Sequence, residues 1–206
     1  MIIPVPEPEL ASGSQGPHAE RCEWTRLEGE GKRERLLEAA AEVFARDGLD
    51  APMSDVAVAA GAGVASVYRL FASKHELLAA LVSRRMNEVA AAAEAARARD
   101  VDRWTALTGL LGSLVATQRA DYLLGEAQLV VSGHPDVVES VARATAALEL
   151  LLAEARAEGR LRSDATAGDL RLLFAATRAA RNVEPEHWPR MLALMIDALD
   201  TDRGGA

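Results

Sequence analysis

The stretch MSDVAVAAGAGVASVYRLF, residues 53–71, predicts two short helices joined by a tight turn. Val56, Ala57 and Ala60 have the spacing of an apolar stripe along the first helix. The Gly-Ala-Gly of residues 61–63 interrupts that stripe, and glycine can take the positive φ that a sharp turn between helices needs. The apolar face of the second helix is expected to carry Val64, Val67, Tyr68 and Phe71.

Two such helices are typical of a helix-turn-helix, because the small residues at their crossing let the backbones approach closely. In that motif the second helix enters the major groove of DNA. A hairpin of helices with glycine in its turn also occurs in many proteins that do not bind DNA. The flanking sequence is therefore needed to distinguish a DNA-binding motif from an ordinary helical hairpin. The positions of the second helix that lie off its apolar stripe are Ala65, Ser66, Arg69 and Leu70.

The segment before this pair predicts a helix over residues 32–47, ended by Gly48. Lys32 lies at its start, where a cation is unfavourable for the helix dipole. A nearby phosphate would explain this position, and ordinary surface charge is an equal alternative. Pro52 suits the start of the next helix, whose first turn carries Ser54.

The segment after the pair predicts a fourth, long helix. Ser73 and Glu76 have the spacing of a capping box, and the apolar pattern continues to about Arg99. Lys74 lies at the helix start, where its charge and the free backbone N–H groups would together hold a phosphate. A helix of this length can connect a small head to a larger body.

The composition favours an all-α protein. The chain has 206 residues, enough for one large or two small domains, and strand-type alternation is nearly absent. Its net charge is −8, but DNA binding needs only a few well-placed cations. Between residues 31 and 78 seven acids face six cations, namely Lys32, Arg33, Arg35, Arg46, Arg69 and Lys74.

Several classes of protein find no support in the sequence. The single cysteine, Cys22, excludes an intrachain disulfide, and the four scattered histidines predict no metal site. No nucleophile motif or phosphate-binding loop is present, so we expect neither an enzyme nor a cofactor. Without a signal peptide or a long apolar run, the protein is expected to be cytoplasmic, with no membrane partner.

The chain divides into four predicted parts. Residues 1–30 are expected to form a disordered arm, 31–78 a three-helix head, 79–201 a helical body and 202–206 a disordered tail. Beyond the long helix the apolar periodicity predicts five more helices, which brings the total to about nine. They cover about residues 102–115, 122–131, 136–158, 168–181 and 186–199.

The stretch ERLLEAAAEVFARDGLDAPMSDVAVAAGAGVASVYRLFASKHELLAAL resembles the N-terminal head of the TetR family of bacterial transcriptional regulators. The match covers about Lys32 to Leu81 without a gap. The most specific motifs are Tyr68-Arg69-x-Phe71 and Ser73-Lys74-x-x-Leu77-Leu78, together with Phe44…Gly48 and Asp55-Val56-Ala57…Ala60-Gly61. Two positions depart from the family pattern: Ala62 replaces a larger aliphatic residue, and Leu70 replaces a polar or aromatic one.

The resemblance implies phosphate contacts for Tyr68 and Lys74 and a groove-facing surface around Ser66 and Arg69. Leu70 could meet a thymine methyl group or be a tolerated exposed apolar residue. The full set of predicted DNA-contacting residues is Lys32, Ser54, Val64, Ala65, Ser66, Tyr68, Arg69, Leu70 and Lys74.

The resemblance also implies a body that binds a small effector among its middle helices. Aromatic or small polar side chains on otherwise aliphatic stripes are the natural pocket candidates, and a plain core position is the alternative for each. With their neighbours, the predicted pocket residues are Trp104, Leu107, Leu111, Tyr122, Gln128, Phe174, Thr177 and Arg178.

In the family the last two helices pair across a two-fold axis, which implies a homodimer. The predicted interface residues are Leu172, Arg181, Trp188, Leu192, Met195 and Leu199. Arg178 and Arg181 could instead meet an acidic effector or cap the end of their helix.

These observations predict a ligand-responsive, DNA-binding transcriptional regulator. We expect a repressor that binds a palindromic double-stranded operator as a dimer and is released by a small-molecule effector. The alternative is a helical ligand-binding or interaction protein that has lost operator binding.

Overall fold

The computed structural model describes residues 24–116, 121–183 and 188–201, and within these ranges the side chains of 115–124 and 177–188 are not described. Apart from one isolated bridge between Leu161 and Asp200, the regular structure of the described residues is helical, as predicted. Besides a short helical segment at residues 24–26, the helices are α2 (Gly29–Asp47), α3 (Met53–Ala59), α4 (Val64–Leu70), α5 (Lys74–Arg97), α6 (Arg103–Ala116), α7 (Asp121–Val130), α8 (Pro135–Ala157), α9 (Ala167–Val183) and α10 (Trp188–Leu199).

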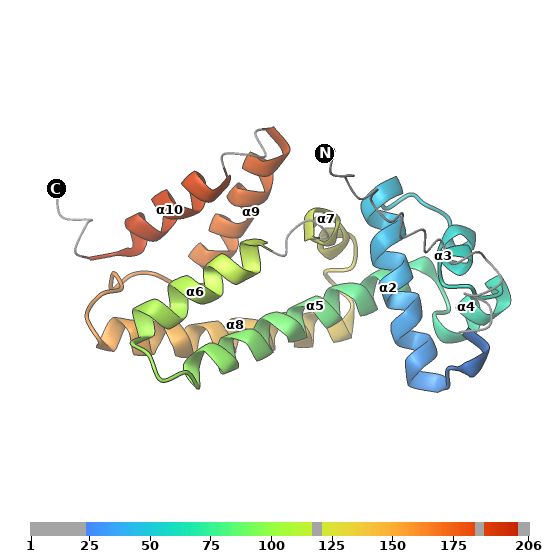
Figure 1. The fold of residues 1–206 in the computed structure, drawn as a ribbon, viewed down its shortest axis with the longest axis horizontal. Coiled ribbons are helices and arrows are strands. Elements are labelled where there is room, and N and C mark those ends of the chain that lie inside the picture. The colour runs from blue at the N-terminus through green and yellow to red at the C-terminus, as the bar shows by residue number, and fades with distance from the viewer. Residues whose placement is uncertain (1–23, 117–120, 184–187, 202–206) are drawn as a thin grey trace, which may run out of the picture.

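The molecule is elongated, with a small head at one end and a larger body at the other (Figure 1). Helices α2, α3 and α4 form the head, and α5 runs from the head along the length of the body. In the body, α6 and α8 lie along α5. Helices α9 and α10 lie above α6 in this view, and α7 lies between head and body.

The predicted arm ends earlier than expected. Most of it, residues 1–23, lies outside the described residues, as does the predicted tail at 202–206. Trp24 is 8% exposed and belongs to the apolar core of the head, with the Lys32 ammonium 5.8 Å from its ring centroid. The expected disorder is therefore wrong for residues 24–30, because this indole buries its ring against the head.

The core of the head is built from α2 to α5 and continues into the body. Leu36, Val43 and Phe44 of α2 pack with Val56 of α3 and with the first turns of α5. The same cluster includes three residues of α7, α8 and their connection, namely Ala127, Val131 and Val137. The predicted border between residues 78 and 79 thus passes through one continuous apolar cluster.

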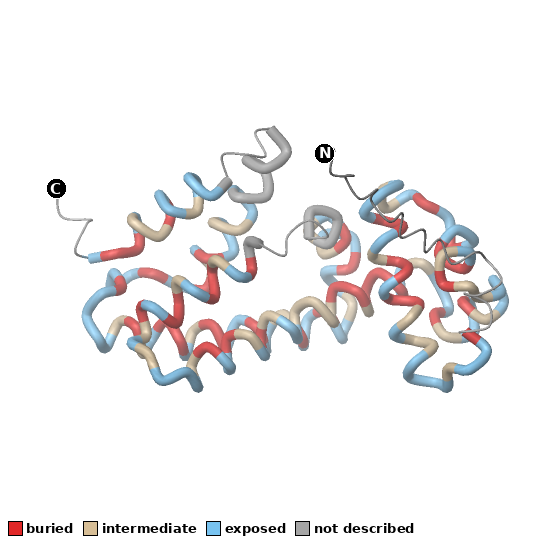
Figure 2. The backbone as a smooth tube through the Cα atoms, viewed as in Figure 1, coloured by how far each residue is buried: buried red, intermediate tan, exposed pale blue. Residues whose placement is uncertain are grey.

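The core of the body rests on the pair α5 and α8, which run side by side in the same direction (Figure 1). Contacts at both ends of the pair establish this direction: His134 lies 3.3 Å from Glu76, and Arg97 Nε donates to Glu154 at 2.9 Å. Buried positions recur along α5 (Figure 2). Half of its buried residues are alanines, and these small side chains let the helices pack closely.

The end of α10 is tied back to the connection between α8 and α9. Arg162 N donates to Leu199 O at 3.1 Å, and Thr201 N donates to Arg160 O at 2.9 Å. The Arg160 guanidinium also pairs with the buried Asp200 at 2.9 Å. These bonds fix the last helix against the body.

Candidate DNA-binding head and candidate ligand cavity

The turn between α3 and α4 has the geometry that its glycines predict. Gly61 has φ +67°, and Ala62 N donates to Ala57 O at 2.8 Å across the turn. Gly63 begins α4 in an extended conformation, and Ser66 N donates to its carbonyl at 2.7 Å. The two short helices are therefore held at a fixed angle by the backbone itself.

The buried face of α4 is narrower than the sequence predicts. Val67 is fully buried and Phe71, directly after the helix, is 2% exposed. Val64 and Tyr68 are 43% and 49% exposed, so their expected place on the buried stripe is wrong. A seven-residue helix packed against a small head can bury little more than one residue per turn, which leaves these two side chains at the surface.

The outer face of α4 carries the side chains that the sequence places there, with one exception. Ala65 and Arg69 are exposed and Ser66 is half-buried, and Arg69 Nη2 donates to Ser66 Oγ at 2.8 Å. This hydrogen bond holds the guanidinium along the helix surface. Leu70 instead is half-buried and packs partly against the core of the head, and its contact with DNA stays a prediction.

Cations flank this face from neighbouring helices. Lys74 is the first residue of α5, and its Nζ lies 5.6 Å from the Phe44 ring centroid. The Arg33 guanidinium lies 4.5 Å from the Phe71 ring centroid. Such contacts hold a long side chain in place while its charge stays intact.

The predicted capping box forms only in part. Ser73 Oγ accepts a hydrogen bond from Glu76 N at 3.1 Å, but the Glu76 carboxylate lies 3.3 Å from His134 Nε2 in the body. Ser54, another predicted DNA contact, is exposed and donates to Asp55 Oδ1 at 3.2 Å, and Lys32 is half-buried beside Trp24.

Several acids of the head are neutralised within the protein. Asp47 pairs with Arg46 at 2.6 Å, Glu38 with Arg35 at 3.7 Å, and Glu34 with Arg84. The hydrogen bond from Arg46 also lowers the pKa of Asp47. Among the described residues, no carboxylate lies within ion-pair distance of Arg69 on α4 or of Lys74 at the start of α5. These two charges are therefore available to an anionic partner.

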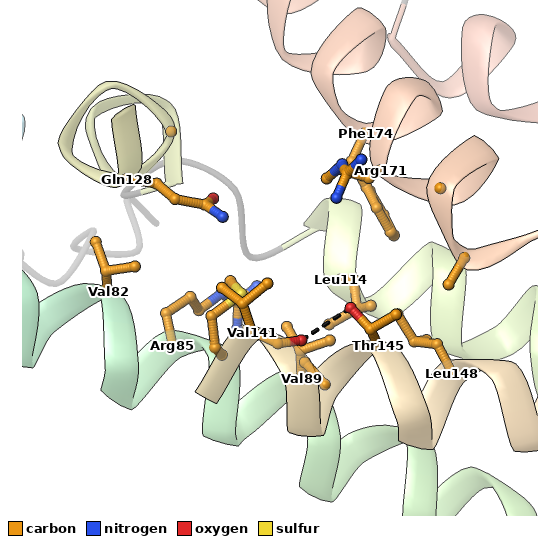
Figure 3. A pocket seen from close by; sticks show the side chains of 15 residues that line it. Val82, Arg85, Val89, Leu114, Gln128, Val141, Thr145, Leu148, Arg171 and Phe174 are labelled. Atoms are coloured by element: carbon orange, nitrogen blue, oxygen red, sulfur yellow. Dashed lines mark hydrogen bonds between the residues drawn. The ribbon is translucent and has the colours of Figure 1, made fainter. Parts of the chain in front are cut away.

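The second candidate site is a cavity of about 150 Å³ in the body. Its floor is formed by α5 and α8, and α7 and α9 close its sides (Figure 3). Gln128 extends from α7, and Arg171 and Phe174 come from α9. The lining residues are Val82, Arg85, Met86, Val89, Leu114, Gly125, Gln128, Val141, Ala144, Thr145, Leu148, Ala167, Gly168, Arg171 and Phe174.

Some of the predicted pocket residues lie elsewhere. Gln128 and Phe174 line the cavity, whereas Trp104, Leu107 and Leu111 are buried in the core of the body and do not reach it. This face of α6 packs onto the body core, and the Arg160 guanidinium covers the Trp104 ring at 5.2 Å. Tyr122, Thr177 and Arg178 were also predicted to line the pocket, but their side chains are not among those described.

Arg85 and Arg171 line the cavity but were missed by the sequence prediction. A signal was present in both cases. Arg85 is a charged residue within the apolar stripe of Val82, Met86 and Val89, and Arg171 precedes Phe174 by one helical turn.

The predicted dimer residues divide into two groups. Leu172 is 67% exposed and Leu192 is half-buried, whereas Met195 and Leu199 are buried within their own protomer, Leu199 in the core of the body. The prediction that Met195 and Leu199 form an interface is therefore corrected, because their side chains are already covered. The side chains of Arg181 and Trp188 lie outside the described set.

The described part of the chain offers neither a metal site nor a membrane-spanning helix. No three His, Cys, Asp or Glu side chains gather there in a way that could hold a metal ion. None of the helices in this part of the chain combines the length and the apolar character needed to cross a membrane.

Comparison with known proteins agrees with this architecture. Residues 36–81 match the family model of the bacterial regulatory proteins of the tetR family. The chain is 30% identical over 109 residues to the uncharacterized HTH-type transcriptional regulator YvdT of Bacillus subtilis (strain 168), a match that covers 52% of this chain and 50% of that protein. The matched part thus spans about half the length of this curated relative.

Solved structures extend the likeness to the body. A TetR transcription regulatory protein from Mycobacterium vanbaalenii superposes with a TM-score of 0.60 at 27% identity, over 82% of this chain and 95% of the other. The TetR transcriptional regulator SCO0520 from Streptomyces coelicolor does so with a TM-score of 0.63 at 25% identity, over 82% and 98%. Residues 36–81 thus form a DNA-binding domain of the TetR family, and the chain as a whole is similar to transcriptional regulators of that family.

Proposed function

We propose that the protein is a transcriptional repressor that binds a two-fold symmetric operator as a homodimer and is released when a small molecule enters the cavity. One observation carries this proposal: the same helix serves both sites. Helix α5 begins at Lys74 beside α4 and contributes Val82, Arg85, Met86 and Val89 to the cavity. With 24 residues it spans about 36 Å at 1.5 Å per residue. A displacement of the helix at the cavity therefore also moves its other end, which lies in the head.

The head supports the DNA-binding part of the proposal. The exposed face of α4 presents Arg69, a side chain suited to base edges, and small side chains that allow close approach to the groove. Lys74 and the exposed Tyr68 flank this face and would contact phosphates. The near-neutral charge of the head does not weaken this assignment, because three of its acids are already paired.

The last two helices support the dimer. Leu172 of α9 and Leu194 of α10 are 67% and 47% exposed, although both helices are otherwise anchored to the body. A second copy related by a two-fold axis would cover these leucines with their own equivalents. Two-fold symmetry of the protein then implies two-fold symmetry of the operator.

Release by an effector requires that the effector bind the DNA-free conformation more tightly than the DNA-bound one. The described lining comes from five helices, so the shape of the cavity depends on how α5, α6, α7, α8 and α9 are arranged. A ligand that fits one arrangement better than another has the differential affinity that such a shift needs.

The DNA-binding part is tested by measuring the affinity for DNA from the flanks of the protein's own gene at several salt concentrations. Lys74→Ala should weaken binding to every sequence and reduce the slope of log K against log[salt] by about 0.9 for each phosphate that is no longer neutralised, or roughly 2 for a dimer. Tyr68→Phe should weaken binding with little change of slope, because its hydroxyl is neutral. Arg99→Ala, which removes an exposed cation just after the far end of α5, is the matched control and should change neither quantity.

An unchanged slope for Lys74→Ala would contradict the phosphate assignment. Failure to bind the flanking DNA even at low salt would favour the alternative, a helical ligand-binding or interaction protein that has lost operator binding.

A further inference from the structure

We propose that the cavity binds a small apolar carboxylate about the size of a single ring, with its carboxylate at Arg171. This inference rests on the proposed function only in assigning the cavity to an effector. The binding chemistry follows from the cavity itself.

The charges in the described wall of the cavity all have one sign. Arg85 of α5 and Arg171 of α9 both line it, and none of the described lining residues is an acid. The remaining polar groups are neutral, since Gln128 is an amide and the Thr145 hydroxyl donates to Val141 O at 2.8 Å. Because Arg85 is paired with Glu88, the charge that favours a negatively charged ligand is that of Arg171.

The acids on the same helices are engaged away from the cavity. Glu88 lies 3.2 Å from Arg85 but is exposed and shared with Arg84 at 3.8 Å. Glu149 accepts from Ala167 N at 2.7 Å and lies 3.5 Å from Arg156. Asp169 accepts from Thr166 Oγ1 at 2.7 Å at the start of α9. Glu88 thus partly neutralises Arg85, whereas Glu149 and Asp169 are not among the described lining residues and have no ion pair with Arg171.

The two arginines have different positions. The Arg85 side chain is 16% exposed, so its charge lies close to the floor of the cavity. Arg171 is exposed, and no acid among the described residues lies within ion-pair distance of it. A carboxylate can therefore pair with Arg171 without displacing an existing partner, and its two oxygens match the fork of a guanidinium. Arg85 also lines the cavity, but its charge is shared with Glu88.

Size and lining define the rest of the ligand. Apolar side chains make up most of the wall, including Val82, Met86, Leu148 and Phe174. A cavity of about 150 Å³ is the size that accepts a benzene ring. Phe174 lies beside Arg171 (Figure 3), so an aromatic or short aliphatic body next to the carboxylate meets an apolar wall.

The test uses three probes with the same ring and different charge, namely benzoate, benzamide and benzylamine. Binding to the purified full-length protein, without DNA, is measured at pH 7 by calorimetry or ligand-observed NMR. We expect benzoate to bind more tightly than benzamide, and benzylamine to bind least. Equal affinities, a preference for benzylamine, or no saturable binding of benzoate would overturn the proposal.

Variants separate charge from shape. Arg171→Gln should reduce benzoate affinity about ten- to hundredfold and leave benzamide nearly unchanged, since a charge-assisted hydrogen bond is lost. Arg171→Lys should keep part of the preference for the acid. Phe174→Ala should weaken benzoate and benzamide alike. Arg143 is an exposed arginine of α8 outside the lining. Arg143→Gln is therefore the matched control and should change neither the benzoate affinity nor the benzamide affinity. If the Arg171→Gln protein kept the parent protein's ratio of benzoate to benzamide affinity, the assignment would be refuted.

A second measurement separates this inference from the proposed function. If benzoate binds in an Arg171-dependent way but flanking DNA is neither bound nor released, the ligand class holds and the repressor function fails. If DNA is bound but no acid enters the cavity, the reverse is true.

Discussion

Replacing Val67 with alanine should loosen α4 far more than the same change at Val64, although both are valines of one short helix. Val67 is fully buried and is the one buried residue within α4, whereas Val64 is 43% exposed. The comparison is well controlled, because both changes remove the same atoms and both gain the same helix propensity, roughly 0.5 kcal/mol.

The expected magnitudes follow from burial. Val67→Ala removes the equivalent of two buried methylene groups, about 1.6 kcal/mol of transfer free energy, and leaves a small cavity that adds roughly 1 kcal/mol. With the propensity gain subtracted, the free energy of unfolding should fall by about 2 kcal/mol. At Val64 only part of the side chain is buried, so the loss of about 0.8 kcal/mol and the propensity gain nearly cancel.

Urea unfolding of both variants, followed by circular dichroism, gives the global difference. Hydrogen exchange of the α4 amides shows whether the loss is local to the head, which matters because a protein with a head and a body need not unfold in one step. Equal destabilisation by the two variants would refute the assigned orientation of α4 and restore the wider apolar stripe that the sequence suggests.

Two further perturbations probe the body. The hydrogen bond from Arg97 and the charges of Arg97 and Arg103 lower the pKa of Glu154, so the stabilisation by this carboxylate is present above its unfolded pKa of about 4.3 and is lost as the pH falls through its folded value. Glu154→Gln should therefore reduce stability at pH 7, by no more than about 1 kcal/mol because the pair is partly exposed, and the difference from the parent protein should shrink in urea titrations below pH 4. Leu194→Glu should convert the proposed dimer to a folded monomer in light scattering, since Leu194 is 47% exposed. Met195→Glu should instead unfold the body, because it places a charge at a buried position. A Leu194→Glu protein that stays dimeric would contradict the assigned interface.

The helices were largely predictable because their signals are local. Apolar spacing, Gly48, Gly61 and the Ser73 cap act within a few residues, and the structure places α2, α3, α4 and α5 close to the predicted bounds. The turn at Gly61 is the clearest case, since only a positive φ lets the backbone reverse between two helices that pack closely.

Placement of individual side chains depends on partners that are distant in the sequence. Periodicity shows that Leu107 and Leu111 face inward, but only the positions of α5 and α8 show that they meet the core and not the cavity. The same holds for Met195, whose apolar spacing fits both a dimer interface and the body core. Arg85 was missed because a charge within an apolar stripe is interpreted as an interruption, not as part of a lining.

Helix α7 shows why head and body are not independent units. Its residues Gly125 and Gln128 line the cavity, while Ala127 belongs to the core of the head together with Val131 just after the helix. Two adjoining faces of one ten-residue helix thus meet the two sites. Packed cores have discrete arrangements and deform little, so a ligand that displaces Gln128 has to move Ala127 as well. Coupling between cavity and head therefore has two routes, along α5 and across α7, and a substitution that blocks one leaves the other in place.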